Sequence, residues 1–150
     1  MVKVGDVVRD FCLKDQHGRE FMLSANAGKK VLLSFHPLAW TSVCALQMKS
    51  LEENVEAFDE LGAVAVGISV DSTFCKNAWA RELKIERTRL LSDFWPKGGL
   101  AIALGIFRGN EGISERANII IDESGKASFV KVYPIPELPD ISEVIAALKG

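Results

Sequence analysis

Short continuous runs of apolar residues alternate along this chain with longer stretches in which apolar residues recur every three or four positions. The runs at residues 31–35 and 63–70 are typical of strands that are buried on both faces of a sheet. Between them, residues 51–61 have the spacing of an amphipathic helix, which Gly62 ends. Strands and helices that alternate in this way predict an α/β domain with a sheet covered by helices.

The remaining segments extend this pattern to the whole chain. Asp71 and Ser72 are suitable caps for a helix over the residues that follow them. Because no linker or internal repeat divides the sequence, we expect a single domain over residues 1–150, with a central mixed sheet flanked by helices and an N-terminal β-hairpin extension. The further predicted elements are a hairpin at 11–23, a helix with Phe74, Ala78, Trp79 and Leu83 on its inner side, a strand at 89–92, a short helix at 100–106, a hairpin at 118–133 and a helix at 141–148.

Charge and hydropathy exclude several classes of partner. The 18 Lys and Arg residues are balanced by 20 Asp and Glu residues, so the chain has no basic field for nucleic acid or anionic lipid. Its longest apolar stretches are far shorter than a membrane span, and residues 1–6 lack an apolar signal region. We therefore expect a cytoplasmic protein whose partners are small molecules or other proteins, with no nucleic acid and no membrane among them.

The chain has three cysteines, Cys12, Cys44 and Cys75, but neither a Cys-x-x-Cys pair nor a zinc-type cluster. We therefore expect no disulfide framework, no metal and no bound cofactor. Ligand crevices in such sheets lie beyond the carboxyl ends of the strands, which is where Cys44 falls. In the first turn of a helix, free N–H groups and the helix dipole favour an anion, so we expect a thiolate there. Thr41, three residues earlier, is placed to cap this helix and to donate a hydrogen bond toward the sulfur or a bound substrate oxygen.

Pro37, Thr41 and Cys44 form the motif Pro-x-x-x-Thr-x-x-Cys. On this motif the chain resembles the peroxiredoxin family of thiol peroxidases, the AhpC/TSA family, and the resemblance implies a thioredoxin-like fold. Within the family, residues 91–96 and the absence of an obvious C-terminal cysteine are most similar to the alkyl hydroperoxide reductase E group, and then to the bacterioferritin comigratory protein group. The other matching stretches are Val4-Gly5-Asp6, Asp10-Phe11, Gly67-Ile68-Ser69-Val70-Asp71, Leu91-Ser92-Asp93, and Arg116 ahead of Ile119-Ile120-Ile121-Asp122.

The resemblance assigns a role to each matching position. Cys44 would attack the terminal oxygen of a peroxide, release water or an alcohol, and become a sulfenic acid. Thr41 and Arg116 would hold the thiolate and the peroxide, and Pro37 would shield the site from bulk water. The positions that depart from the family pattern are Ser42, where proline is common, and His36, where an aromatic residue is frequent.

The sequence allows more than one way of reducing the sulfenic acid back to the thiol, and more than one oligomeric state. Cys75 is predicted near the same sheet edge as Cys44, and it is interpreted either as a resolving cysteine or as an inert residue that fills space. Cys12 is expected to be structural. If neither resolves, the sulfenic acid is reduced by thioredoxin, glutaredoxin or a low-molecular-weight thiol. The resemblance points to a homodimer through residues 94–96, whereas the alternative is that Trp95 caps the core of its own chain.

Two other functions use the same cysteine. In the first, oxidation of Cys44 changes a partner interface, so that the protein is a peroxide-responsive redox sensor or chaperone-like binding protein. In the second, the chain is a thioredoxin-type disulfide reductase, which needs a Cys-x-x-Cys pair. Thr41 occupies the first place of that pair, so the sequence argues against the second alternative.

Overall fold

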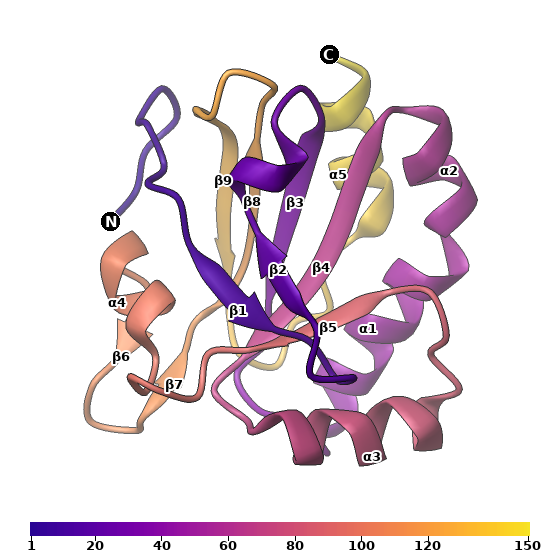
Figure 1. Ribbon diagram of the computed structural model, residues 1–150, viewed down its shortest axis with the longest axis vertical. Helices are drawn as coiled ribbons and strands as arrows, with labels where there is room; N and C mark the ends of the chain where they lie inside the picture. Colours follow the sequence, from indigo (N-terminus) through magenta and orange to yellow (C-terminus); the bar gives the residue numbers. More distant parts are fainter.

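The computed structural model describes residues 1–150 and is built around one mixed sheet of seven strands, in the order β2-β1-β5-β4-β3-β8-β9 (Figure 1). The central strands β3, β4 and β5 are parallel, and β8 runs antiparallel to β3. The predicted mixed sheet is therefore confirmed. The strands of this sheet are β1 (Cys12–Lys14), β2 (Glu20–Met22), β3 (Lys30–Phe35), β4 (Ala63–Ser69), β5 (Arg89–Ser92), β8 (Arg116–Ile121) and β9 (Ala127–Tyr133).

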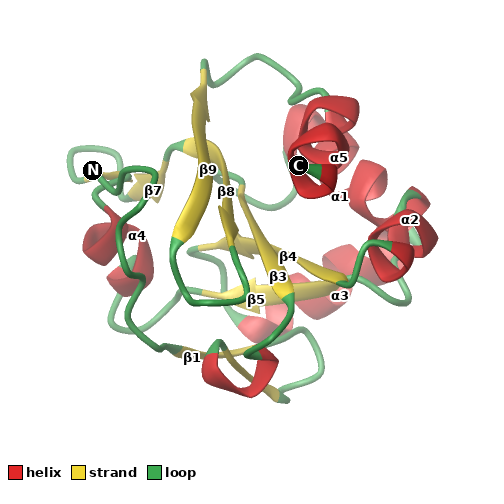
Figure 2. Cartoon of the chain, turned by 90° about the horizontal axis from the view of Figure 1, so that it is seen from above, coloured by secondary structure: helices red, strands yellow, loops and turns green.

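Helices cover the two faces of the sheet unequally. In Figure 2, α1, α2, α3 and α5 lie on one side of the strands and α4 lies on the other. None of the helices has the length and apolarity needed to cross a membrane. The remaining elements are the 3-10 helix η1 (Ser24–Asn26), α1 (Ser42–Glu53), α2 (Val55–Glu60), α3 (Thr73–Leu83), α4 (Gly99–Leu104), the small hairpin of β6 (Phe107–Arg108) and β7 (Ile113–Ser114), and α5 (Ile141–Lys149).

Two apolar layers form because side chains alternate between the faces of each strand. On β3, Val31, Leu33 and Phe35 point into a layer completed by the N-terminal hairpin and α4, which we call the hairpin face. Leu32 points the other way, into a layer completed by α1, α2, α3 and α5, which we call the helix face. Ile120 of β8 lies in that second layer.

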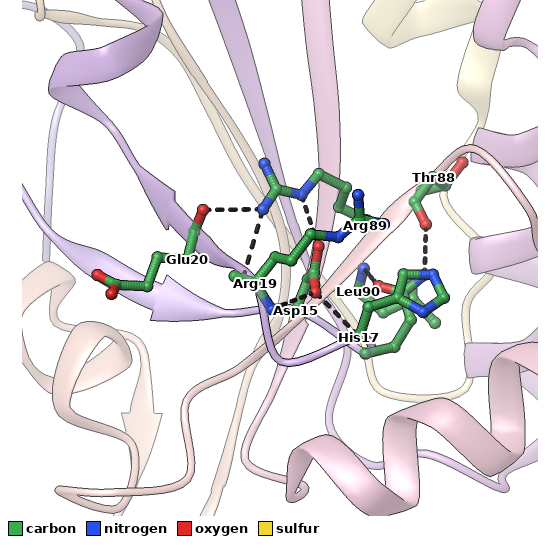
Figure 3. A network of polar contacts seen from close by, with 8 residues as sticks. Asp15, His17, Arg19, Glu20, Thr88, Arg89 and Leu90 are labelled. Carbon is green, nitrogen blue, oxygen red and sulfur yellow. Dashed lines mark hydrogen bonds and ion pairs between the residues drawn. The ribbon is translucent and has the colours of Figure 1, made fainter.

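The predicted N-terminal hairpin is present and is attached to the sheet through a polar network (Figure 3). The Asp15 carboxylate accepts hydrogen bonds from the main-chain N–H groups of His17 and Arg19, which closes the turn. Arg89 of β5 pairs with the same carboxylate at 2.8 Å from Nε to Oδ2, and its guanidinium also donates to the carbonyl of Glu20. One buried carboxylate thus fixes the turn and joins it to the central sheet.

The helix predicted over residues 51–61 is interrupted, which corrects that prediction. Asn54 has φ −110° and ψ 14°, and it separates α1 from α2. Its side-chain Nδ2 donates to the carbonyl of Ser50 at 2.7 Å. Asparagine favours such breaks because its side chain competes for main-chain hydrogen bonds.

The predicted inner side of α3 is also wrong in part. Ser72 caps this helix as expected, accepting from the N–H of Cys75. However, Phe74 is 85% exposed and Ala78 is exposed as well, and the buried side chains are those of Lys76, Trp79 and Ala80. Residues 76, 79, 80 and 83 have the regular spacing of one inward helix face. A prediction based on apolar residues misses this face because its first residue is a lysine.

Candidate active site

The site lies where β3 ends and α1 begins. Cys44 is in the first turn of α1, beyond the carboxyl end of β3, as predicted. Because β8 is antiparallel to β3, its first residue reaches the same end of the sheet, and Phe35 pairs with Ala117. This register brings Arg116 to Cys44 although the two are 72 positions apart in the sequence.

Arg116 is the polar side chain that contacts the sulfur. Its Nη1 lies 3.3 Å from Cys44 Sγ and also donates to Gln47 Oε1 at 2.7 Å. Its Nε donates to the carbonyl of Ile135 at 2.9 Å, in the segment after β9. The guanidinium is therefore held by two neutral oxygens and points one of its nitrogens at the thiol.

Gln47 also belongs to this site, although it lies outside the motif of Pro37, Thr41 and Cys44 and was not predicted. It lies three residues after Cys44, so both side chains project from the same face of α1. Its Nε2 donates to Ser34 Oγ at 2.8 Å and to the carbonyl of Phe35 at 3.1 Å. The Ser34 hydroxyl in turn donates to Asn118 Oδ1. The sequence feature that could have predicted this role is a glutamine at a helix position that faces the sheet, because a buried amide needs polar partners.

The charges around the sulfur are unequal. Cys44 has no solvent exposure and Arg116 is only 2% exposed, yet no carboxylate lies within ion-pair distance of that guanidinium. A buried arginine without an anionic partner is costly. Of the three groups that Arg116 contacts, the Cys44 sulfur is the one that can carry a negative charge.

Thr41 lies at the N-terminus of α1, but its hydroxyl neither caps this helix nor donates to the sulfur, which corrects those two predictions. It is the N-cap residue by backbone conformation, with no capping hydrogen bond from its side chain. Its Oγ1 donates instead to the carbonyl of Leu38 at 2.8 Å. Trp40, which intervenes, has φ 68°, and this tight turn brings the carbonyl within reach of the hydroxyl. The first-turn N–H groups of α1 therefore have no side-chain acceptor. Pro37, which precedes this turn in the sequence, is buried.

The other two cysteines are free thiols that face carboxylates. Cys75 is half-buried, its Sγ lies 3.7 Å from Asp71 Oδ1, and burial followed by the negative charge of Asp71 raises its pKa. Cys12 is exposed, and its hydrogen bond to Glu20 raises its pKa. A raised pKa leaves little thiolate at neutral pH, so neither thiol is activated for attack on another sulfur.

The aromatic loop after β5 is on the surface. Phe94 is 53% exposed and Trp95 is 84% exposed. The alternative in which Trp95 caps the core of its own chain is therefore wrong. The two rings line a surface hollow together with Phe74 of α3. As for metals, the structure brings together no three His, Cys, Asp or Glu side chains that could hold an ion.

The fold and the site define a thioredoxin-like α/β protein with a buried cysteine and arginine pair at the start of its first long helix. Residues 4–130 match the AhpC/TSA family, and the chain belongs to that family. Alkyl hydroperoxide reductase E of Mycobacterium bovis is 34% identical over 141 residues, which cover 93% of this chain and 92% of that protein.

Two solved structures are similar along nearly the whole chain. Peroxidoxin BcpB from Mycobacterium tuberculosis has a TM-score of 0.87 at 29% identity, covering 99% of this chain and 97% of that one. The reduced 2-Cys peroxiredoxin of Plasmodium vivax has a TM-score of 0.91 at 24% identity, covering 99% and 81%. These matches confirm the thioredoxin-like fold and the family that the sequence motif indicated.

Proposed function

We propose that this chain is a thiol-dependent peroxidase in which Cys44 is the peroxidatic cysteine. The observation that carries this assignment is the contact between Arg116 Nη1 and Cys44 Sγ, inside a region where the arginine has no carboxylate partner. Burial alone would suit a core cysteine. A buried guanidinium aimed at that cysteine instead suits a sulfur that carries charge. Membership of the AhpC/TSA family supports the same assignment.

The reaction follows from the charge that the site is built to move. The Cys44 thiolate attacks the terminal oxygen of a hydroperoxide, so that an S–O bond forms as the O–O bond breaks. The sulfur is oxidised to a sulfenic acid and the peroxide is reduced. The leaving oxygen departs as hydroxide or alkoxide and takes one proton to become water or an alcohol. Arg116, which is always charged, stabilises the negative charge at both ends of this displacement.

The remaining predicted residues act on the peroxide. The Thr41 hydroxyl uses its proton on Leu38, so its lone pairs are free to accept a hydrogen bond from the peroxide O–H. The N–H groups of Val43 and Cys44 lie in the first turn of α1, where no side chain caps them, so they are free to donate to the same oxygens. Pro37 is buried, and its role in this proposal is to keep water from the sulfur.

We propose that an external thiol restores Cys44. Cys75 and Cys12 both have raised pKa values, which argues against either one as the resolving thiol. The reductant is then thioredoxin, glutaredoxin or a low-molecular-weight thiol. Three free cysteines suit a reducing compartment, and we propose the cytoplasm.

We also propose that the chain forms a homodimer through its exposed aromatic loop. Phe94 and Trp95 lie beside Phe74, which is itself 85% exposed. Large apolar rings gathered in one hollow are typical of interface cores rather than of ordinary surface. Analytical ultracentrifugation of the wild type and of Trp95→Ala tests this, with a monomer expected for the variant.

The assignment of Cys44 is tested by single-turnover kinetics with hydrogen peroxide. Cys44→Ser is expected to abolish peroxide reduction with the fold intact, while Cys75→Ser and Cys12→Ser keep a fast first turnover. Wild-type kinetics in Cys44→Ser would refute the assignment. Slow peroxide consumption by the wild type, combined with oxidation-dependent capture of a partner protein, would favour the redox-sensor function instead.

A further inference from the structure

A second buried cation lies close to the site, on the inner face of α3. Lys76 has no solvent exposure, and its Nζ lies 2.7 Å from Nε2 of His36, the fully buried residue that follows β3. The Trp79 ring packs against both groups, with its centroid 5.7 Å from the lysine nitrogen and 5.3 Å from the centre of the imidazole. Lysine is rarely buried without an ionic partner, so a fully buried lysine that pairs with a histidine is unusual.

While Lys76 carries its proton, the hydrogen bond between the two side chains fixes the protonation state of His36. An ammonium group has only donors, so His36 Nε2 accepts and the imidazole is neutral. Burial, followed by the charge of Lys76, accordingly holds the pKa of His36 well below its usual value. His36 Nδ1 is then a buried N–H that makes no hydrogen bond of good geometry, although the main chain of Ser34 lies near the imidazole.

No carboxylate pairs with the Lys76 ammonium. Burial lowers its pKa from 10.5 to about 7, while the negative charges of Asp71, Cys44 and Cys75 raise it. Of these three, Asp71 already accepts from the N–H of Ala39 and from the Ser69 hydroxyl. Cys75 has a raised pKa and is a neutral thiol at pH 7. The charged or titratable groups facing the Lys76 and His36 pair are therefore Cys44 from α1, Asp71 from the loop after β4, Cys75 from α3 itself and Arg116 from β8.

Coupling between two sites is reciprocal. Cys44 and Trp79 belong to the same buried cluster on the helix face, and both Lys76 and His36 pack against the Trp79 ring. A positive charge buried beside this cluster favours a negative charge on a sulfur within it, and the two charges stabilise each other equally. We propose that Lys76, positioned by His36 behind the start of α1, is the second positive charge that stabilises the Cys44 thiolate, in addition to Arg116. This inference rests on the proposed role of Cys44. Lys76 does not touch the peroxide, so it acts through its charge on the sulfur, and His36 is its positioning residue.

Oxidation of Cys44 removes the charge that Lys76 stabilises. The thiolate becomes a neutral sulfenic acid, while the departing oxygen takes up one proton. Without the thiolate, the ammonium group has lost one of the negative charges that hold its proton, so Lys76 releases part of a proton to solvent near pH 7. The release partly balances the proton that the leaving oxygen consumes.

The test is the pH profile of Cys44 in wild type, Lys76→Met and Lys49→Met. Lys49 lies on α1 and is exposed, so its replacement removes the same charge without touching the buried pair. Two rates are measured from pH 5 to pH 9: single-turnover oxidation by hydrogen peroxide, and alkylation by iodoacetamide followed on the Cys44 peptide by mass spectrometry. The second rate reports the thiolate without any peroxide chemistry.

For Lys76→Met we expect both profiles to move upward by roughly one pH unit, so that each rate falls roughly tenfold on the rising part of its profile and changes little on the plateau. Lys49→Met should superimpose on the wild type. A folded Lys76→Met whose two profiles coincide with the wild type would overturn the proposal. Cys44→Ser distinguishes the two claims, because rapid peroxide reduction by that variant would refute the role of Cys44 itself.

A measurement on the unaltered chain guards against a variant that does not fold. The lysine ε-CH₂ resonances, followed by NMR during a pH titration, should include one that titrates near pH 7 in the reduced protein. Its midpoint should fall when Cys44 is oxidised by one equivalent of hydrogen peroxide. A midpoint that does not respond to oxidation would also overturn the proposal.

Discussion

The two faces of strand β3 carry different kinds of residue. On the hairpin face, Val31, Leu33 and Phe35 are all apolar and buried. On the helix face, Leu32 is apolar, whereas Ser34 and then His36 beyond the strand end are polar and buried. The polar residues thus gather on one face and at one end of the sheet.

Strand β8 repeats this division in the opposite direction. Ala117, Ile119 and Ile121 point into the hairpin face, and Arg116 and Asn118 lie with Cys44 and Gln47 on the helix face. Because β8 is antiparallel to β3, its polar start meets the polar end of β3. The hairpin face and the far end of the helix face therefore supply apolar burial. The buried polar and charged side chains gather at one end of the helix face, which we call the polar corner.

The first expected difference is that burying the charge of Lys76 at the polar corner lowers the free energy of unfolding by an amount that depends on pH. The pKa of Lys76 is about 7 in the folded protein, against 10.5 for an ordinary lysine. Below pH 7 both states bind the proton and the full penalty of burying the charge is present. Between pH 7 and 10.5 the unfolded state binds more protons, so the free energy of unfolding rises with pH.

The Lys76→Met variant isolates this contribution. Compared with the wild type at pH 6, its free energy of unfolding should be higher by an amount on the order of 5 kcal/mol at most. The difference should shrink as the pH approaches 10. Urea unfolding at several pH values measures it, and a difference that is independent of pH would show that the buried charge is not its source.

The hairpin face is expected to supply stability without affecting chemistry. Leu33→Ala removes a fully buried side chain and should lower the free energy of unfolding by about 2–5 kcal/mol. The peroxide rate of the folded fraction should not change. Urea unfolding and stopped-flow kinetics check the two halves of this prediction, with Ile102→Ala at a site 57% exposed as the control. A large loss of rate in Leu33→Ala would break the division between the two faces.

The polar corner is expected to govern the rate. Arg116→Met removes the donor to Cys44 Sγ and should lower the second-order rate constant for peroxide by about 10²–10³. Arg108→Met, which removes a half-buried arginine paired with Glu111 and Glu115, serves as the control for the loss of a guanidinium. Equal rates in Arg116→Met and wild type would remove the electrostatic basis of the site.

Gln47 should have a smaller effect because it positions Arg116 rather than contacting the sulfur. Gln47→Leu removes the 2.7 Å acceptor of Arg116 and should lower the peroxide rate by about tenfold. Gln47→Glu should be slower still, since a carboxylate would pair with Arg116 and compete with the thiolate. Stopped-flow rates that rank the two variants in the reverse order would contradict this role.

Sequence patterns were sufficient for most of the fold. Continuous apolar runs located β3 and β4, and the motif of Pro37, Thr41 and Cys44 located the start of α1. Asn54 and Phe74 were misread because helical spacing alone does not register a side chain that competes with the backbone, or an apolar ring left in solvent.

The network within the site could not be read from spacing. Gln47 and Lys76 are polar residues on inward helix positions, and their partners come from β3, from β8 and from the residue after β3. Which partners meet depends on strand register and helix rotation, to which a local pattern gives no access. The hydroxyl of Thr41 turned toward Leu38 because Trp40 adopts a left-handed conformation that nothing in the sequence indicated.

The identity of the oxidised sulfur is the most direct test of this account. The reduced protein is treated with one equivalent of hydrogen peroxide in the presence of a sulfenic-acid trap such as dimedone, and each cysteine peptide is weighed by mass spectrometry. We predict the adduct on the Cys44 peptide, with Cys12 and Cys75 recovered as unmodified thiols. An adduct on Cys75 or Cys12, with Cys44 still reduced, would contradict it.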